Sequence, residues 1–95
     1  MIVNSIAFKP GNELTFRSVI ALKKSIYQAI TAAEGEVFIL DLNEVRHCDS
    51  AGIALLIEVQ KFCVQQNKKL EIIGMSSHTQ SLADFCGVRD ILEVI

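Results

Sequence analysis

The chain has 95 residues, a formal net charge of −2, and a composition that is 51% hydrophobic and 21% charged. Its length fits a single domain spanning residues 1–95, and the scarcity of clustered Lys and Arg argues against nucleic-acid binding. No apolar run reaches the roughly 18–20 residues of a membrane-spanning helix, and the N-terminus lacks the pattern of a signal peptide. Three cysteines without a CxxC pair predict free thiols and a reducing cytoplasm.

The first third of the chain predicts two short strands followed by a helix. Residues 2–8 and 13–16 have the apolar content of strands, and the Pro-Gly pair between them suits a tight turn that pairs them. Ser18 can start a helix that Gly35 ends. The apolar residues of this helix recur at steps of three and four and therefore share one stripe: Val19, Leu22, Ile26, Ala29, Ile30 and Ala33.

The rest of the chain alternates between strands and helices. The expected elements are strands at residues 37–42, 70–75 and 91–95 and helices at residues 50–66 and 79–85. The run VFILDL in the first of these strands is typical of a central strand covered on both faces. Ser77 and Gln80 resemble a capping box for the last helix. The order β-β-α-β-α-β-α-β predicts an α/β fold, with three helices packed on a mixed, mostly parallel sheet of about five strands.

The start of the second helix is the candidate functional site. Seven consecutive residues from Ala51 to Ile57 carry no polar side chain, so the first two turns are apolar on every side. Gly52 costs a helix up to about 1 kcal/mol relative to alanine, which suggests that something approaches closely here. The run can fill gaps against a neighbouring helix, or it can form a protein–protein interface. The interface interpretation assigns partner binding to Asp49, Ser50, Ala51, Gly52, Ile53, Ala54 and Ile57.

Ser50 itself admits several interpretations. It can be a helix cap, or it can accept a phosphate, whose charge the helix N-terminus favours and Asp49 opposes. As a hydrolase nucleophile it lacks the first glycine of GxSxG, and His47 and His78 are poor candidates for its base. Because His47, Cys48 and Asp49 are consecutive, they are unsuited to converge on one metal ion. We therefore expect no catalytic residue, no metal and no other cofactor.

The residues around Ser50 resemble a known family. A strand that ends at Asp41-Leu42, a short loop and the sequence DSAGIALL at residues 49–56 are similar to the hallmark of STAS domains, the fold of anti-sigma-factor antagonists. The expected element order and the sequence SLADFCGV at residues 81–88 resemble the same family, so the likeness covers nearly the whole chain. The resemblance implies a STAS fold and a non-catalytic, partner-binding role.

Two branches of the family imply different partners. In the antagonist branch, a partner kinase phosphorylates the serine that matches Ser50, and the phosphorylated form releases the anti-sigma factor. In the MlaB branch, a STAS subunit binds and regulates the cytoplasmic ATPase of a phospholipid-transport ABC complex of the MlaFEDB type, which maintains outer-membrane lipid asymmetry. The residue that matches Ser50 then forms part of the ATPase contact.

The resemblance is closer to the MlaB branch. The chain ends soon after its last expected strand, and the uncharged run at residues 53–57 suits a stable complex. This branch implies a cytoplasmic protein that is peripheral to the inner membrane through its ATPase partner. The alternative is an antagonist of an anti-sigma factor kinase, with Ser50 as its phosphoacceptor, because serine is the commoner residue at this position among antagonists.

Overall fold

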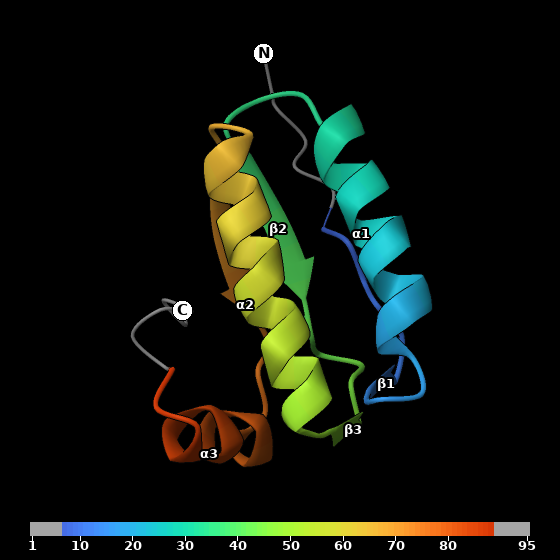
Figure 1. Cartoon of the computed structure of the whole chain (residues 1–95), viewed down its shortest axis with the longest axis vertical. Coiled ribbons are helices and arrows are strands. Elements are labelled where there is room, and N and C mark those ends of the chain that lie inside the picture. Colours follow the sequence, from blue (N-terminus) through green and yellow to red (C-terminus); the bar gives the residue numbers. More distant parts are fainter. Residues whose placement is uncertain (1–6, 89–95) are drawn as a thin grey trace.

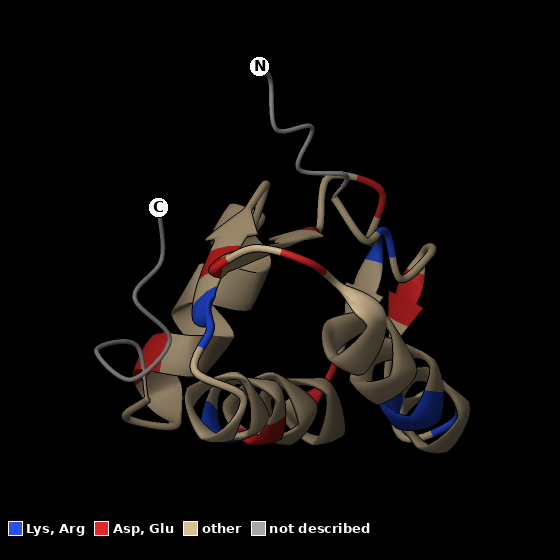
Figure 2. Cartoon of the chain, turned by 90° about the horizontal axis from the view of Figure 1, so that it is seen from above, with Lys and Arg blue, Asp and Glu red and all other residues tan. Residues whose placement is uncertain are grey.

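The computed structural model describes residues 7–88. The elements are β1 (Glu13–Leu14), α1 (Val19–Ala32), β2 (Val37–Asp41), β3 (His47–Cys48), α2 (Ser50–Gln65), β4 (Lys69–Ile73) and α3 (Ser77–Phe85). Helices α1 and α2 lie side by side in front of β2 and β4 in Figure 1, and Figure 2 shows the same two layers from above. Helix α3 lies across the lower end of the molecule and contacts α2 (Figure 1).

The strands form two parallel pairs. β2 pairs with β4 along its whole length, β1 pairs with β3, and Phe8 adds a parallel bridge to Leu40. The predicted parallel pairing is confirmed for these strands. The prediction of a mixed, five-stranded sheet is wrong for the described part of the chain, which has four short strands in two parallel pairs.

Burial along β2 also differs from the prediction. Phe38 and Leu40 are buried, whereas Ile39 and Asp41, which alternate with them, are half-buried. Successive side chains point to opposite faces of a strand. The described residues therefore bury one face of β2 fully and the other face only in part. Helices α1 and α2 lie on the same side of the strands, which explains the difference between the two faces (Figure 2).

The strand predicted at residues 13–16 is shorter than expected and has an unexpected partner. It is reduced to Glu13–Leu14 and pairs with β3, a two-residue strand that we did not predict. The expected pairing of the strand at residues 2–8 with residues 13–16 is wrong where it can be followed, because Phe8 bridges Leu40 in parallel and Glu13–Leu14 pairs with β3. Residues 2–6 and the expected strand at residues 91–95 lie outside the described residues. Gly11, in the turn before β1, has a φ of 97°, which confirms the positive φ expected there.

Helix α1 follows the predicted apolar stripe. Ile26 and Ile30 are buried, and the other members of the stripe pack against the core. Ser18 precedes the helix as predicted, but its hydroxyl donates to the Glu13 carbonyl oxygen at 2.9 Å and does not cap the helix. The helix ends at Ala32 with the extended Ala33 as its C-cap, so Gly35, whose φ is 90°, lies beyond the cap and does not itself end the helix as predicted.

Helix α2 provides most of the central core. Leu55, Leu56, Val59 and Cys63 are buried, and Phe62 packs against them. Burial raises the pKa of the Cys63 thiol to about 11, so the thiol stays protonated at neutral pH and packs as a small apolar group. No helix within residues 7–88 combines the length and the apolar character needed to cross a membrane.

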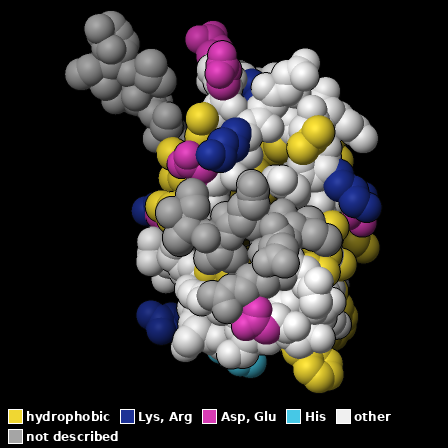
Figure 3. All heavy atoms as spheres, turned by 90° about the vertical axis from the view of Figure 1, so that its left-hand side faces the viewer, with side chains coloured by type: hydrophobic (Ala, Val, Ile, Leu, Met, Phe, Trp, Pro, Cys, Tyr) yellow, Lys and Arg dark blue, Asp and Glu magenta, His cyan; other side chains and the backbone are white. Residues whose placement is uncertain are grey.

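Helix α3 begins two residues earlier than predicted. Its cap is Ser76, whose hydroxyl accepts a hydrogen bond from the Thr79 N–H at 3.1 Å, so the predicted capping box of Ser77 and Gln80 is wrong. The Gln80 side chain instead donates to the carbonyl oxygen of Met75 at 3.0 Å. Figure 3 shows exposed hydrophobic side chains at the lower edge of the molecule, where α3 and the start of α2 lie.

Candidate functional site

Asp49 joins the start of α2 to the segment that precedes α1. Its Oδ1 atom accepts a hydrogen bond from the Gly52 N–H at 3.1 Å and thereby caps the helix. Its Oδ2 atom accepts one from the Phe16 N–H at 3.1 Å, and its own N–H donates to the Leu14 carbonyl oxygen at 3.1 Å. One residue thus connects two segments that are 33 positions apart in the sequence.

The charge state of Asp49 follows from these contacts. Burial raises the pKa of the carboxyl group, but hydrogen bonds from the backbone N–H groups of Phe16, Gly52 and Ala51 outweigh burial and lower the pKa below its usual value. The carboxylate is therefore ionised at neutral pH, and its negative charge lies where the dipole of α2 favours it. Asp49 stabilises the site as an anion rather than as a proton donor.

Ser50 presents its hydroxyl to solvent. It is the first residue of α2 and is exposed, and because Asp49 is the cap, the interpretation of Ser50 as a helix cap is wrong. Within residues 7–88, no hydrogen bond joins the Ser50 hydroxyl to His47, His78 or any other group. The hydroxyl is accessible to a molecule that approaches the start of α2.

The close approach expected at Gly52 is made by the protein itself. A Cβ atom at this position would overlap the carbonyl oxygen of Leu14 and stand 2.9 Å from its carbonyl carbon and from its Cβ atom. β1 therefore crosses directly over the first turn of α2, in a space that only glycine leaves free. Gly52 is buried against Leu14, so the close approach expected here is explained without a partner, and the assignment of Gly52 as a partner contact stays a prediction.

The other predicted site residues divide between the interior and the surface. Ile53 is only 1% exposed, because α3, β1 and β3 all pack against α2, so its predicted exposure to a partner is wrong. Ser50 and Ala54 are exposed, and Ala51 and Ile57 are half-buried. Residues three and four apart share one side of a helix. We call the surface formed by Ser50, Ala51, Ala54 and Ile57 the Ser50 face.

Two exposed apolar residues extend the candidate site beyond α2. Phe16 is 70% exposed and is held next to the start of α2 by its hydrogen bond to Asp49, and Ile20 in the first turn of α1 is 84% exposed. Sequence reasoning missed both. The signal for Ile20 was its position outside the apolar stripe of α1, since an isoleucine there has no place in the core.

The roles of Asp49 and Ser50 can be separated by their effects on stability. We expect Asp49→Ala to lower the free energy of unfolding by about 1–2 kcal/mol at neutral pH, because the helix loses its cap. The exposed Ser50 gives a matched control, because Ser50→Ala should change the free energy of unfolding by less than about 0.5 kcal/mol. Urea denaturation of the three proteins measures the difference, and equal losses in both variants would contradict the assignment of the cap.

The stability difference between the wild type and Asp49→Ala should depend on pH. The pKa of Asp49 is lower in the folded protein than its usual value of 3.8, which applies to the unfolded chain. Its stabilising contribution is therefore complete above that pH and is lost as the pH falls through the folded-state pKa. The stability difference between the wild type and Asp49→Ala should accordingly shrink on acidification below that range.

Comparisons with known proteins identify the fold. A family model described as "STAS domain" matches residues 2–95. The chain belongs to the STAS domain family. Proteins named "Anti-sigma-B factor antagonist" are similar to it. The one from Listeria monocytogenes is 30% identical over 71 residues, and those from Staphylococcus epidermidis and Staphylococcus aureus are 29% and 27% identical over 86 residues.

The extent of these matches differs. The alignment covers 75% of this STAS domain but only 62% of the Listeria protein, so the chain spans less than two thirds of that relative's length. For both Staphylococcus proteins it covers 90% of this chain and 79% of the relative.

The family assignment confirms the STAS resemblance and leaves the choice of branch to the relatives. All three are named antagonists of an anti-sigma factor, which supports the branch that we expected only as the alternative. None of these names supports the expected closeness to MlaB or a role in phospholipid transport.

Within residues 7–88 of this STAS domain, no group of three or more His, Cys, Asp or Glu side chains is placed to hold a metal ion.

Proposed function

We propose that this STAS domain is a non-catalytic antagonist that binds an anti-sigma factor through the Ser50 face. The observation that carries the proposal is the exposed Ser50 hydroxyl, which lies on a helix start surrounded by small apolar side chains. Small side chains let a partner's backbone approach closely, and the scarcity of charge suits a desolvated contact. The names of the relatives support the choice of an anti-sigma factor as the partner.

In this proposal, phosphorylation of Ser50 controls binding of the anti-sigma factor. In the proposed reaction, a kinase transfers the γ-phosphoryl group of ATP to the Ser50 Oγ atom, a base of the kinase takes the hydroxyl proton, and ADP leaves. The phosphate adds a charge of about −1.5 to −2 at pH 7, which the N-terminus of α2 tolerates. The same charge lies beside the Asp49 carboxylate and on an apolar surface, so a partner packed on that surface is released.

Mass spectrometry of the intact protein tests the phosphoacceptor. We expect one phosphate to be added when the chain is incubated with ATP and the anti-sigma factor kinases encoded in the same genome, and none to be added to Ser50→Ala. Ser25→Ala, which changes an exposed serine of α1, serves as the control and should be phosphorylated like the wild type. A phosphate that persists in Ser50→Ala, or no phosphate with any of these kinases, refutes the phosphorylation part of the proposal.

A second candidate function is a subunit of a phospholipid-transport ABC complex, held at the inner membrane by its ATPase. The observation in its favour is the lack of charge on the Ser50 face, because an uncharged surface suits a permanent complex better than a reversible one. Co-expression with the ATPase and permease subunits of such a transporter separates the two candidates. Stable co-purification and a changed ATPase rate support the transporter, whereas binding to an anti-sigma factor supports the antagonist.

A further inference from the structure

A small apolar hollow lies between α1 and α2, close to the Ser50 face. It has a volume of about 120 Å³, and we call it the α1–α2 hollow. Its lining residues are Val19, Ile20, Lys23, Leu55 and Glu58. Leu55 is buried and Val19 half-buried, whereas Ile20 is largely exposed.

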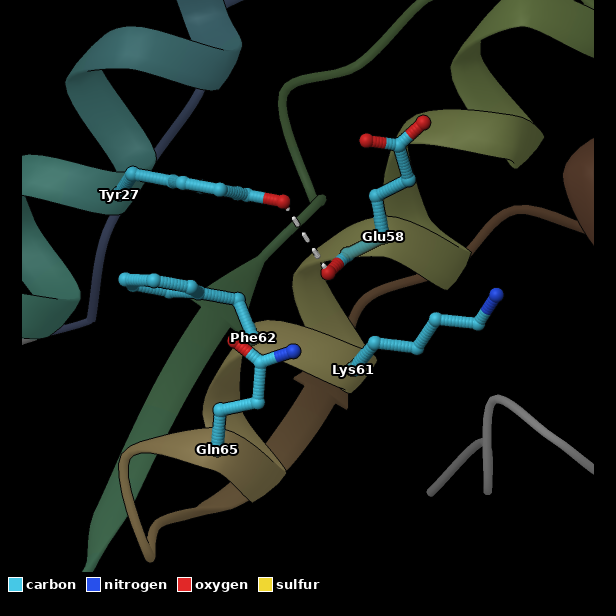
Figure 4. A pocket seen from close by; sticks show the side chains of 5 residues that line it. All are labelled: Tyr27, Glu58, Lys61, Phe62 and Gln65. Atoms are coloured by element: carbon cyan, nitrogen blue, oxygen red, sulfur yellow. Dashed lines mark hydrogen bonds between the residues drawn. The ribbon is translucent and has the colours of Figure 1, made fainter.

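Charged and polar groups limit the hollow on one side. The Lys23 Nζ atom lies 2.7 Å from a Glu58 carboxylate oxygen and 5.5 Å from the centre of the Tyr27 ring, so this ion pair spans the two helices. Beyond it lies a second hollow, shown in Figure 4, where Tyr27 stacks on Phe62 and donates a hydrogen bond to the Glu58 carbonyl oxygen. Lys61 and Gln65 also line this second hollow (Figure 4), so the purely apolar surface ends at the ion pair.

The other side of the α1–α2 hollow is continuous with the Ser50 face. Leu55 lies one turn after Ala51 and directly follows the exposed Ala54 on α2. Phe16, four residues before Ile20, is tied to the residue that caps α2. Leu55 and Glu58, which line the hollow, each lie one turn after a residue of the Ser50 face, Ala51 and Ala54, so Ile20 of α1 and the small side chains of α2 lie on neighbouring surfaces.

We infer that the partner which binds the Ser50 face inserts one aliphatic side chain, of the size of leucine or isoleucine, into the α1–α2 hollow. The inference rests on the proposed function and adds an anchor point to it. Apolar cavities of about 150 Å³ hold a benzene molecule, so a hollow of 120 Å³ matches a branched aliphatic side chain. Ile20, which lines the hollow, then covers the inserted group, which explains why this side chain is left in water in the unbound chain.

Affinity measurements with three variants of Ile20 and a control test this anchor. The probe is the anti-sigma factor from the same genome that binds or phosphorylates the wild-type chain, and calorimetry measures the dissociation constant. We expect Ile20→Asp to weaken binding about tenfold or more and Ile20→Ala to weaken it less, while Ile20→Met, which keeps an apolar side chain of similar size, stays within about threefold. The control is Val64→Asp, which charges another exposed aliphatic residue, outside the hollow, and should bind like the wild type.

The outcomes separate this inference from the proposed function. If Ser50→Glu abolishes binding while Ile20→Asp binds like the wild type, the hollow is no anchor and the proposed function stands. If no anti-sigma factor binds the wild type, both proposals fall. If light scattering shows that the wild type self-associates and that Ile20→Asp is monomeric with unchanged partner affinity, the occupant is a second copy of the chain and the inference is overturned. Circular dichroism melting of each variant verifies that it is folded.

Discussion

Gly52→Ala is expected to lower the stability of the domain by about 1–3 kcal/mol and its melting temperature by about 5–20 °C. The added Cβ atom would overlap the Leu14 carbonyl oxygen, which belongs to the backbone of β1 and cannot rotate away as a side chain does. β1 must therefore move from α2, and its pairing with β3 and the Asp49–Leu14 hydrogen bond weaken together. Thermal and urea denaturation measure the loss.

Helix propensity alone predicts the opposite sign for the change in stability, so the result of Gly52→Ala separates the two effects. In an open helix position, glycine to alanine stabilises by about 1 kcal/mol. Ala54→Gly, the reverse exchange at an exposed position half a turn further along α2, serves as the control and should cost about that amount. A more stable Gly52→Ala protein would show that β1 does not cross the helix as closely as the structure places it.

Ser50→Glu is expected to leave the fold intact and to weaken binding of the anti-sigma factor about 100-fold or more. The side chain at position 50 is exposed, and an acidic residue in the first turn of a helix is favourable, so the melting temperature should stay within about 2–3 °C of the wild type. The new carboxylate must lose water against an apolar partner surface and lies next to the Asp49 carboxylate, which disfavours the complex. Calorimetric titration measures the affinity.

The matched control for this charge is Ser25→Glu, which places the same carboxylate on an exposed serine of α1. It should bind the partner like the wild type, and any general effect of net charge would appear in both variants. If Ser50→Glu binds normally, the Ser50 face does not contact the partner. If the variant unfolds instead, position 50 has a structural role that its exposure does not show.

The helices were predictable because their signals are local. The stripe of α1 and the buried positions Leu55, Leu56 and Val59 of α2 follow from the spacing of apolar residues, which depends only on the helical repeat. The pairing of β1 with β3 was not predictable, since two strands of two residues each carry no periodic pattern and their partners are far apart in the sequence. β3 was missed for the same reason.

The position of the candidate site in the sequence was predicted, but the burial of its individual residues was not. The sequence DSAG marked the start of α2, and Ser50 and Ala54 are exposed as expected. Its composition gave no means of telling that β1 covers Gly52 or that neighbouring elements bury Ile53, because both effects arise from tertiary packing. Phe16 joined the site through its backbone N–H, a group that every residue but proline has and that leaves no trace in the sequence.

The hydrogen bond from the Phe16 N–H to Asp49 is a long-range contact that depends on folding of the whole segment between them. Helix α2 is built from contacts between near neighbours, but this bond and the β1–β3 ladder bring together parts of the chain that meet late, after a long loop has closed. Formation of α2 alone therefore does not place Phe16 beside the start of the helix. That placement needs the long-range bond to Asp49 as well.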